Sequence, residues 1–392
     1  MMNFEDLKIS SDIKKSIVKM GFKKLTPIQE QTLPDSLKGK DILGQSQTGS
    51  GKTIAFSIPI LEKLFIPDKS PQAIILCPTR ELSIQIASQI NKLGSNLKKF
   101  KVLPVYGGQA IGKQTRVLKK GVHIVVGTPG RVIDHIRRGN LDLIGVETLV
   151  LDEVDEMLDM GFRNDIEKIL TYTLNKKQTL MFSATIPKEI KQIAKMYQNN
   201  PKFVKISDKK ENLPKIEQYA FKCNFKDKVN GLTKLLDDNN SKLILIFCNT
   251  KKSVNFVYNR LRYKYSVDSI HGDMNQKNRI KVMNKFKNGN IKILVASDVA
   301  ARGLDINNID IIINFDVPQN ANEYTHRIGR TARAGKSGMA FTLVSYDEVK
   351  RFKKIKNSIK TKFIEKQLPK NDNFDMKSRM VIKNDNLKDY KK

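Results

Sequence analysis

The chain is poor in the residues that mark disulfide-rich, zinc-binding and membrane proteins. It has 3 cysteines, Cys77, Cys223 and Cys248, whose spacing is not that of a metal site. Two of them close apolar runs, so we expect buried thiols in a reducing compartment. No apolar run approaches the roughly 18 residues of a membrane span, and the N-terminus lacks the basic start and apolar stretch of a signal peptide. We therefore expect a soluble, cytoplasmic protein with no membrane partner.

Acidic residues are scarce beside basic ones. The 71 Lys and Arg residues exceed the 40 Asp and Glu residues, which gives a formal net charge of +31. Such an excess favours a polyanionic partner such as nucleic acid. A coding bias that loads the surface with lysine and asparagine explains the charge equally well, so composition leaves both interpretations open. The 4 histidines are scattered and form no nucleophile or metal constellation: His123, His135, His271 and His326.

Length and apolar rhythm predict the fold class. A chain of 392 residues exceeds one ordinary core, and two domains fit it best. Short apolar runs alternate with helix-length amphipathic stretches, which is typical of α/β domains with a parallel sheet covered by helices on both faces. The predicted strands are 41–43, 73–77, 102–105, 123–126, 148–151 and 179–182, then 243–247, 266–270, 291–295, 309–314 and 339–344.

A polar stretch at 208–214 interrupts this rhythm and ends in a proline, so we predict a linker there. It separates an N-terminal domain, 1–207, from a C-terminal domain, 215–365. Apolar residues at helical spacing predict a terminal helix over 349–364. We expect a mobile basic tail over 366–392, either a short nucleic-acid-binding arm or a solvated charged end.

The strongest motif is Ser46-Gln-Thr-Gly-Ser-Gly-Lys52-Thr53, which follows an apolar strand and opens a helix. In that setting, backbone amides cradle phosphates, Lys52 reaches the β- and γ-phosphates, and the Thr53 hydroxyl ligates Mg²⁺. The loop residues that contact the phosphates are then Thr48, Gly49, Ser50 and Gly51. The segment predicts a nucleotide site.

A second motif, Asp152-Glu153-Val154-Asp155, follows the predicted strand 148–151. Asp152 is placed to hold Mg²⁺ through its water shell, and Glu153 to orient or deprotonate the attacking water. Capping of the next helix would be the simpler reading of this tetrapeptide alone. With a phosphate loop in the same domain, the catalytic interpretation is favoured.

Three other strand ends carry polar residues: Pro78-Thr79-Arg80-Glu81-Leu82, Thr128-Pro129-Gly130-Arg131 and Ser183-Ala184-Thr185. The first two each combine a helix N-terminus, a hydroxyl and an arginine, all suited to phosphodiester oxygens. Each alone reads as helix capping. Their recurrence at one edge of one sheet predicts a continuous binding track.

In the second domain, Arg327, Arg330 and Arg333 are spaced three apart. If this segment is helical, they share a face and can converge on one anion. Gly329 and Gly335 interrupt the segment, as close backbone approach to a ligand requires. The alternative is a basic helix that meets solvent.

The segment after the predicted strand 291–295 carries further candidates. Ser297 and Arg302 are suited to a sugar-phosphate backbone, while Gly303 and Asp305 can approach a nucleotide. By residue chemistry alone this is a weak signal.

Taken in order, these strings resemble the DEAD-box family of ATP-dependent RNA helicases, from Phe4 to about Ser345. The segment Gly21-Phe22-Lys-Lys-Leu-Thr-Pro-Ile-Gln29 resembles the adenine-reading Q motif of that family. An aromatic ring such as Phe22 can stack on a purine, and Gln29 can read the N6 and N7 edge of adenine.

The resemblance implies two RecA-like domains that close when ATP and RNA bind together, and an RNA-stimulated ATPase that unwinds short duplexes or remodels RNA–protein complexes. It implies that Ser183 and Thr185 couple hydrolysis to strand separation through Asp155 and His326. ATP contacts are implied for Gly303, Asp305, Arg327 and Arg330, with Arg330 as arginine finger. Implied RNA-backbone contacts are Thr79, Arg80, Gly107, Gly108, Thr128, Arg131, Asn249, Thr250, Gln276, Arg279 and Ser297.

Further expectations follow from the same resemblance. The cofactors are ATP and Mg²⁺, RNA is bound through its backbone with little sequence preference, and the chain is a monomer. RNA-processing or ribosome-assembly proteins are expected partners. An ATP-gated RNA clamp with little unwinding activity is the alternative, and a DNA helicase is disfavoured by the Q-motif segment.

Four positions depart from the family pattern: Ser46, Val154, Ser297 and Ala332 stand where Ala, Ala, Thr and Gly are usual. None removes a charge or a metal ligand, so we expect changes of rate rather than loss of activity. Val154 is the departure of most concern, because its branched side chain can crowd the helix behind the carboxylates.

Overall fold

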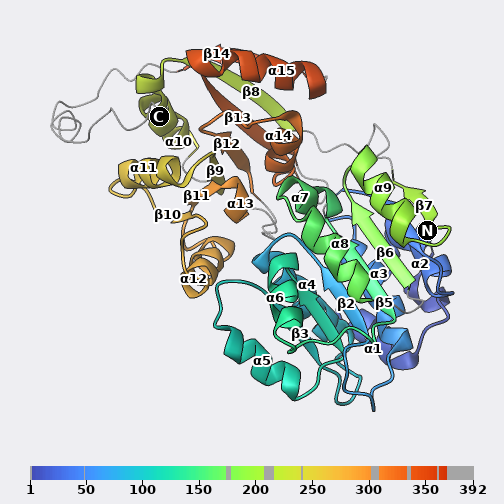
Figure 1. Ribbon diagram of the computed structural model, residues 1–392. Helices are drawn as coiled ribbons and strands as arrows, with labels where there is room; N and C mark the ends of the chain where they lie inside the picture. Colours follow the sequence, from blue (N-terminus) through green and yellow to red (C-terminus); the bar gives the residue numbers. More distant parts are fainter. Residues whose placement is uncertain are drawn as a thin grey trace. The chain divides into compact units, whose positions relative to one another are not determined.

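The computed structural model describes residues 2–47, 49–173, 178–206, 216–239, 242–301, 309–332, 337–359 and 362–368 (Figure 1). The predicted linker, most of the predicted tail and several predicted site residues lie outside this part of the chain. Those residues are Thr48, Arg302, Gly303, Asp305, Arg333 and Gly335.

Contacts along the chain divide it into two compact units. Met1–Leu213 forms nearly all of the first, and Pro214–Ala301 with Ile306–Lys392 forms the second. Each contains a seven-stranded sheet in which every neighbouring pair of strands is parallel. The predicted α/β class with two helix-covered parallel sheets is confirmed.

The first unit has the strand order β3-β4-β2-β5-β6-β1-β7. Its strands are β1 (Ile42–Gln45), β2 (Ala73–Leu76), β3 (Val102–Val105), β4 (Ile124–Gly127), β5 (Thr148–Asp152), β6 (Gln178–Ser183) and β7 (Lys202–Lys205). Its helices are α1 (Ser11–Lys19), α2 (Pro27–Ser36), α3 (Lys52–Lys63), α4 (Arg80–Leu93), α5 (Ile111–Lys119), α6 (Pro129–Arg137), α7 (Val154–Asp159), α8 (Arg163–Tyr172) and α9 (Lys188–Tyr197).

Both faces of this sheet are buried because alternate side chains of each strand enter different apolar clusters. In β2, Ile75 joins the apolar cluster that contains residues of α1 to α4, while Ile74 and Leu76 join the cluster that contains residues of α5 to α9. A strand buried on both sides must be apolar throughout. The continuous apolar runs in the sequence are therefore explained.

The second unit has the strand order β10-β11-β9-β12-β13-β8-β14. Its strands are β8 (Ile216–Cys223), β9 (Ile244–Cys248), β10 (Val267–Ile270), β11 (Ile293–Ser297), β12 (Ile311–Asn314), β13 (Gly338–Ser345) and β14 (Ile364–Gln367). Its helices are α10 (Lys228–Asp237), α11 (Lys251–Leu261), α12 (Gln276–Lys287), α13 (Asp298–Ala301), α14 (Ala321–Ile328) and α15 (Val349–Ile359).

Every strand predicted from an apolar run is present, with each end within two residues of the predicted one. The strands that were not predicted are β7, β8 and β14. In β7 three of four residues are exposed, and in β14 all four are. Edge strands of this kind are held by ladder bonds on one side and need no apolar run.

The C-terminal end of the second unit differs from the prediction. The expected helix over 349–364 ends at Ile359, and β14 then pairs in parallel with β8. The predicted domain end at 365 lies inside this strand. Phe363 packs against Phe352 and Tyr324, with ring centroids 5.0 and 5.6 Å apart, which anchors the strand to α15 and α14.

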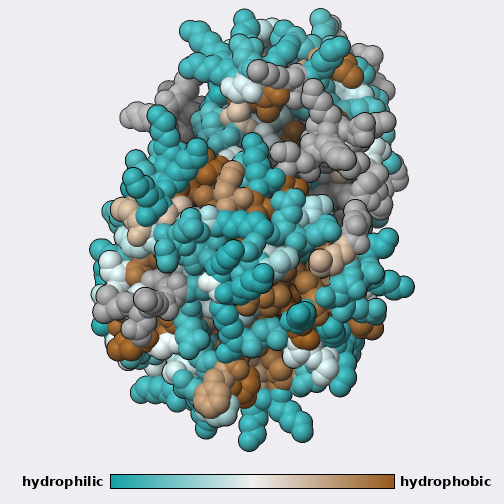
Figure 2. All heavy atoms as spheres, turned by 90° about the vertical axis from the view of Figure 1, so that its right-hand side faces the viewer, coloured by the Kyte–Doolittle hydropathy of each residue, from teal (hydrophilic) through white to brown (hydrophobic). Residues whose placement is uncertain are grey.

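The surface and the cysteines agree with what the composition predicts. Hydrophilic side chains cover most of the face seen in Figure 2. No helix in the described ranges is both long and apolar enough to cross a bilayer. The cysteines are free and buried, as predicted, and burial raises the pKa of Cys77 and Cys248 well above its ordinary value.

Candidate nucleotide and RNA sites

In the first unit, most predicted site residues follow the carboxyl ends of the strands. The ends of β1 and β5 carry the phosphate loop and the carboxylates, the end of β6 carries the predicted coupling residues, and the ends of β2, β3 and β4 carry predicted RNA-contacting residues; Phe22 and Gln29 lie before β1. Because the order is β3-β4-β2-β5-β6-β1, the first three of these strand ends and the last three occupy adjacent halves of one sheet edge. This edge is where open α/β sheets bind ligands.

The phosphate loop joins β1 to α3 and depends on glycine. Gly49 and Gly51 have φ of 81° and 95°, in the left-handed region that favours glycine. A Cβ at Gly51 would lie 2.5 Å from Gln29 Nε2 and 2.8 Å from Thr26 Oγ1. The Lys52 ammonium is buried and donates to the Ser46 carbonyl at 3.0 Å. The loop thus folds tightly around the lysine that is predicted to reach the phosphates.

Ser46, one of the departures from the family pattern, takes part in this loop. Its hydroxyl lies 2.9 Å from the Ser50 hydroxyl, which in turn donates to the Gln47 carbonyl at 2.8 Å. Its backbone N–H donates to the Ser183 carbonyl at 3.0 Å, which ties the loop to the end of β6. An alanine would keep the backbone bond and lose the hydroxyl pair.

The Q-motif residues take different environments. Gln29 is buried and bridges two backbone groups: its Oε1 accepts from Thr26 N at 2.9 Å, and its Nε2 donates to the Gly51 carbonyl at 3.0 Å. The sequence did not predict this support of the phosphate loop. Phe22 is 42% exposed, with its ring 6.5 Å from that of Phe4, so one side of it is accessible to a base.

The carboxylates of the second motif stand between β5 and α7. Asp152 is buried and accepts from Glu153 N at 3.1 Å. Burial raises the pKa of Asp152, while the charge of Lys52 opposes the rise. Glu153 has φ 54° and ψ 53°, a strained conformation for a residue with a side chain. Strain of this kind clusters at functional sites, and here it falls on the predicted general base.

The predicted coupling residues lie together. Asp155 Oδ2 accepts from the backbone N–H and the hydroxyl of Thr185 at 2.8 and 2.9 Å. Asp155 N donates to the Ser183 hydroxyl at 3.2 Å. The acidic segment of α7 is therefore bonded directly to the segment that follows β6.

Val154 begins α7 and is fully buried in the apolar cluster on that face of the sheet. The helix behind the carboxylates forms with this side chain in place. An effect of Val154 on the rate stays a prediction.

The RNA half of the sheet edge is built around Arg80. Gly108, with φ 79°, lies so close to it that a Cβ there would be 2.8 Å from Arg80 Cζ. A Cβ at Gly107 would lie 3.4 Å from the same guanidinium. Arg131 donates to the Gln109 carbonyl at 2.9 Å. The loops after β2, β3 and β4 are thus in contact with one another, as a continuous track requires.

Of the threonines of this track, Thr79 caps a helix with its side chain, as the alternative interpretation held, whereas Thr128 makes no side-chain cap bond. Thr79 Oγ1 accepts from Leu82 N at 3.2 Å, and in the second unit Thr250 Oγ1 accepts from Ser253 N at 3.1 Å. Each cap bond uses a lone pair of the hydroxyl and not its proton. Capping is therefore compatible with donation to a phosphate. Thr128, 9% exposed, precedes α6.

The arginine segment of the second unit is not one helix. Its helix α14 ends at Ile328 with Gly329 as the cap, so Arg330 lies beyond the helix. The shared helical face proposed for Arg327 and Arg330 is therefore wrong. His326 lies in the last turn of α14.

Arg327 is 1% exposed and uses every N–H of its guanidinium inside the second unit. Nε and Nη2 bind the two oxygens of Asp298, both at 2.6 Å, and Nη2 also donates to Asn249 Oδ1 at 2.7 Å. Nη1 donates to Asn314 Oδ1 at 3.2 Å and to the Asp316 carbonyl at 2.8 Å. With all five donors engaged, Arg327 has none left for a phosphate.

Of the remaining candidates of the second unit, Asn249 bonds this arginine directly, and the others lie on β11 and α12. Asn249 also donates to the Val317 carbonyl at 3.0 Å, and Ser297, 9% exposed, ends β11 beside Asp298. Gln276 and Arg279 lie in α12 and are buried, and Arg279 donates to the Ala300 carbonyl at 3.3 Å.

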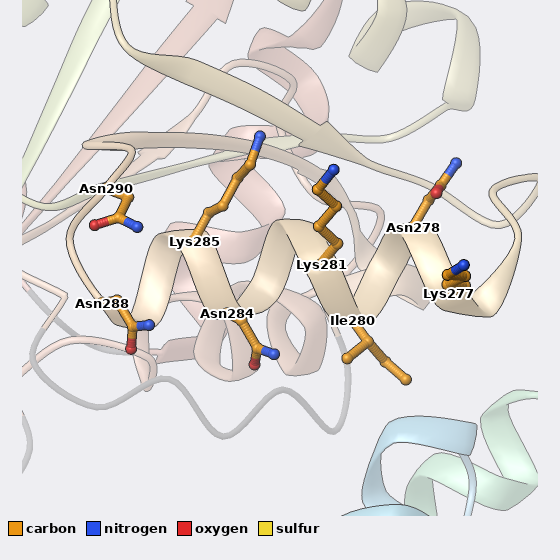
Figure 3. A pocket seen from close by; sticks show the side chains of 8 residues that line it. All are labelled: Lys277, Asn278, Ile280, Lys281, Asn284, Lys285, Asn288 and Asn290. Atoms are coloured by element: carbon orange, nitrogen blue, oxygen red, sulfur yellow. The ribbon is translucent and has the colours of Figure 1, made fainter.

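Basic side chains mark the outer surface of α12. A hollow of about 630 Å³ lies along this helix, and its lining contains no predicted site residue (Figure 3). Lys277, Lys281 and Lys285 follow one another along the helix there, and Lys285 pairs with Asp268 at 3.7 Å. The surface suits an anionic ligand, and it continues from the helix end that carries Gln276.

Comparison with known proteins agrees with this geometry. Residues 26–193 match the DEAD/DEAH box helicase family, and residues 227–335 match the helicase conserved C-terminal domain. The DEAD-box ATP-dependent RNA helicase CshA of Geobacillus kaustophilus is 48% identical over 92% of this chain and 78% of its own length. CshA of Bacillus subtilis is 47% identical over 92% of this chain and 73% of its own.

Solved structures show the same fold. S. cerevisiae Dbp5 bound to RNA and ADP BeF3 matches with a TM-score of 0.83 at 30% identity, over 98% of this chain and 99% of that one. A DEAD box protein from Methanococcus jannaschii matches with a TM-score of 0.54 at 42% identity, over 94% of this chain and 99% of that one. The two sheets are those of tandem RecA-like domains. With these matches and the phosphate-loop, carboxylate and RNA-track geometry together, the chain belongs to the DEAD-box family of ATP-dependent RNA helicases.

Proposed function

We propose that this protein hydrolyses Mg²⁺-bound ATP in an RNA-stimulated reaction and uses the energy to separate short RNA duplexes. The observation that carries the proposal is the shared sheet edge of the first unit. Its nucleotide half contains Lys52 and Asp152, its RNA half contains Arg80 and Arg131, and β5 and β2 join the halves directly. An ATPase whose activity depends on RNA needs such contiguity.

In this proposal, the loop amides from Thr48 to Gly51 hold the phosphates, Lys52 neutralises the β- and γ-phosphates, and Glu153 orients or deprotonates the attacking water. Phe22 stacks on the adenine. Arg330 supplies the arginine finger, and Gly303 and Asp305 complete the nucleotide contacts. Arg327 is reassigned from ATP contact to support of the second unit, because its donors are already used.

Magnesium fits the residues at the nucleotide site. Asp152 is a buried carboxylate at a strand end, within electrostatic reach of Lys52, and Thr53 follows that lysine in α3. Mg²⁺ takes oxygen ligands and usually binds one or two carboxylates together with substrate phosphates. Within the described ranges, no group of three or more His, Cys, Asp or Glu side chains could hold a metal. The ion would thus depend on ATP for further ligands and would neutralise phosphate charge.

The route from hydrolysis to RNA runs through the Asp155 cluster. Thr185 and Ser183 bond Asp155 three residues after Asp152, so a change at the carboxylates displaces the segment after β6. We assign coupling to these residues together with His326, as the family resemblance implies.

RNA is bound through its phosphates and 2′-hydroxyls, with little sequence preference and a steep loss of affinity with salt. The contacts proposed for the first unit are Thr79, Arg80, Gly107, Gly108, Thr128 and Arg131. Those proposed for the second are Thr250, Ser297, Gln276, Arg279 and Asn249.

The domain assignment follows from these roles. Residues 1–207 bind ATP and RNA, 208–214 link the domains, and the second domain begins at 215 and includes β14. We propose a cytoplasmic monomer that works with RNA-processing or ribosome-assembly proteins. The relatives are named ATP-dependent RNA helicases, which favours unwinding over a clamp.

Displacement of a labelled strand from a short RNA duplex tests this proposal. We expect displacement with ATP, none with Lys52→Ala, and little from a matched DNA duplex. ATP-dependent RNA retention without displacement would support the clamp instead. Equal displacement of DNA would contradict RNA specificity.

A further inference from the structure

One buried side chain with no predicted role lies behind the RNA track. Gln114, on α5, is 1% exposed. Its Nε2 donates to the Tyr106 carbonyl and to Gln109 Oε1, both at 2.9 Å. Its Oε1 accepts from His135 Nε2 at 3.0 Å and from Arg131 Nη1 at 3.3 Å. Both donors and both lone pairs of the carboxamide are used.

These four bonds tie the turn after β3 to helix α6. Tyr106 and Gln109 flank Gly107 and Gly108 on either side, so bonds to both fix the ends of the glycine turn. The other two partners, His135 and Arg131, lie on α6, and Arg131 is in the first turn of that helix, just after β4. A single amide thus holds the turn after β3 in place against the arginine after β4.

The turn needs this support because of its position in the sheet. β3 is an edge strand with β4 as its neighbour, so the chain that leaves it has sheet contacts on one side. The turn must also keep Gly108 at φ 79°, close to Arg80. A shift of this turn would displace two glycines and the guanidinium that packs on them.

His135 completes the arrangement from α6. Its side chain is fully buried, and its Nε2–H donates to Gln114, which leaves Nδ1 without a partner among the described residues. Burial and the nearby charge of Arg131 lower the pKa of His135. The lowered pKa favours the uncharged ring beside Arg131, whose guanidinium would repel an imidazolium.

We propose that Gln114, supported by His135, is a positioning residue that sets the geometry of the RNA grip without touching RNA. This inference rests on the proposed function and deepens it. Gln114 bonds none of the nucleotide residues, so its loss acts on RNA affinity and not on ATP binding. When the amide is removed, its buried hydrogen-bond partners are left unpaired, and this destabilises the arrangement of the two segments.

The test compares Gln114→Leu with Gln178→Leu in the full chain. Gln178 is also a buried glutamine of the first unit, and its Nε2 donates to the Ser36 and Lys40 carbonyls at 2.8 and 2.7 Å. It begins β6, at the opposite edge of the sheet from the sites. Both variants therefore lose a buried carboxamide, and one of them leaves the RNA loops untouched.

The readouts are the RNA concentration for half-maximal ATPase activity, the KM for ATP at saturating RNA, and thermal unfolding. For Gln114→Leu we expect the RNA concentration for half-maximal activity to rise about ten-fold or more. The KM for ATP should stay within about two-fold of that of the unchanged protein, because only RNA binding in the ground state is lost. For Gln178→Leu we expect lower stability and an unchanged RNA value. Equal shifts in both variants, or no shift in Gln114→Leu, would overturn the inference.

A milder variant keeps the test informative if Gln114→Leu does not fold. Gln109→Ala removes one partner of the carboxamide at a partly exposed position, and we expect a smaller rise in the same RNA value. No rise would count against the inference. If the unchanged protein shows no stimulation by RNA, the proposed function fails as well. If RNA stimulates the unchanged protein and the variants of Gln114 and Gln109 need no more RNA than it does, only this inference is overturned.

Discussion

Arg327 and Asp298 form a two-pronged ion pair inside the second unit, with Nε–Oδ1 and Nη2–Oδ2 distances of 2.6 Å. Arg327 is 1% exposed, so the pair is removed from water on the arginine side. The same guanidinium binds Asn249, so it joins α14 to the segments after β11 and β9. Asn249 is itself a predicted RNA contact, and Ser297, which directly precedes Asp298, is another.

Arg327→Lys should therefore act on stability and RNA binding. A lysine cannot reproduce the fork, and breaking a buried pair typically costs about 3–5 kcal/mol. We expect a clear drop in the free energy of unfolding and weaker RNA binding in filter or anisotropy assays. Unchanged unfolding with a large rise in the KM for ATP would restore Arg327 as a nucleotide contact.

Arg330→Ala should give the contrasting result. We proposed Arg330 as the arginine finger, a group that acts in the transition state, so its loss is expected to lower kcat by ~10³ to 10⁵. We expect ATP and RNA binding to change much less than kcat, which single-turnover kinetics with a labelled nucleotide can separate. Retention of most of the turnover would rule out the assignment.

Ala332 is predicted to be strained. Its φ of 56° lies in the left-handed region, which costs a residue with a Cβ about 1–2 kcal/mol. Ala332→Gly removes that cost and adds a smaller loss of chain entropy, about 0.5–1 kcal/mol. We expect a net gain of up to about 1 kcal/mol in the free energy of unfolding, measured by denaturant titration.

The control for this variant is Ala87→Gly, in the interior of α4. A glycine there should lower stability by about 1 kcal/mol or more. Loss of stability in both variants would show that the backbone at 332 is not strained.

Ser46→Ala tests the hydroxyl pair of the phosphate loop. A hydrogen bond of this kind contributes about 0.5–1.5 kcal/mol net. If the loop must open the Ser46–Ser50 pair to admit phosphates, the variant should lower the KM for ATP by up to about ten-fold, with kcat little changed. A raised KM in steady-state kinetics would show instead that the pair supports the bound loop.

The lowered pKa of His135 predicts that the free energy of unfolding depends on pH. It faces Arg131, Asp134 and Arg138 on its own helix and Gln114 on α5, and its pKa is lowered. Below about pH 6.5, the ordinary histidine pKa, the unfolded chain binds a proton that the folded chain does not. Stability should thus fall as the pH falls through that value towards the lowered pKa. His135→Gln should show a shallower slope between pH 5 and 7, and an identical slope would contradict the prediction.

The sequence predicted most strands because strands buried on both faces have to be apolar throughout. It did not predict β7 and β14, which are exposed edge strands without an apolar run, nor β8, in which only four of eight residues are buried. The helix boundary at Ile328 was also missed, because the arginine spacing of three imitates a helical face and Gly329 was interpreted as a sign of ligand contact.

The candidate site, like the fold, was predicted only in part. Motif order predicted residues that gather at the sheet edge, and the family resemblance implied the Asp155–Thr185 contact. It could not show which donors neighbours had already used, and so Arg327 was assigned to ATP. Gln114 carried one weak signal: a polar residue four positions before Leu118, on the face of α5 that is buried. No sequence motif marks such a residue, and its role can be inferred only from its hydrogen bonds in the structure.

The most direct measurement is steady-state ATPase activity with and without RNA, with matched DNA as a control and Glu153→Gln as the inactive variant. We expect strong stimulation by RNA, little by DNA, and loss of turnover in Glu153→Gln with ATP binding retained. Activity that is independent of RNA, or that persists in Glu153→Gln, would contradict the central claim that one sheet edge couples ATP hydrolysis to RNA.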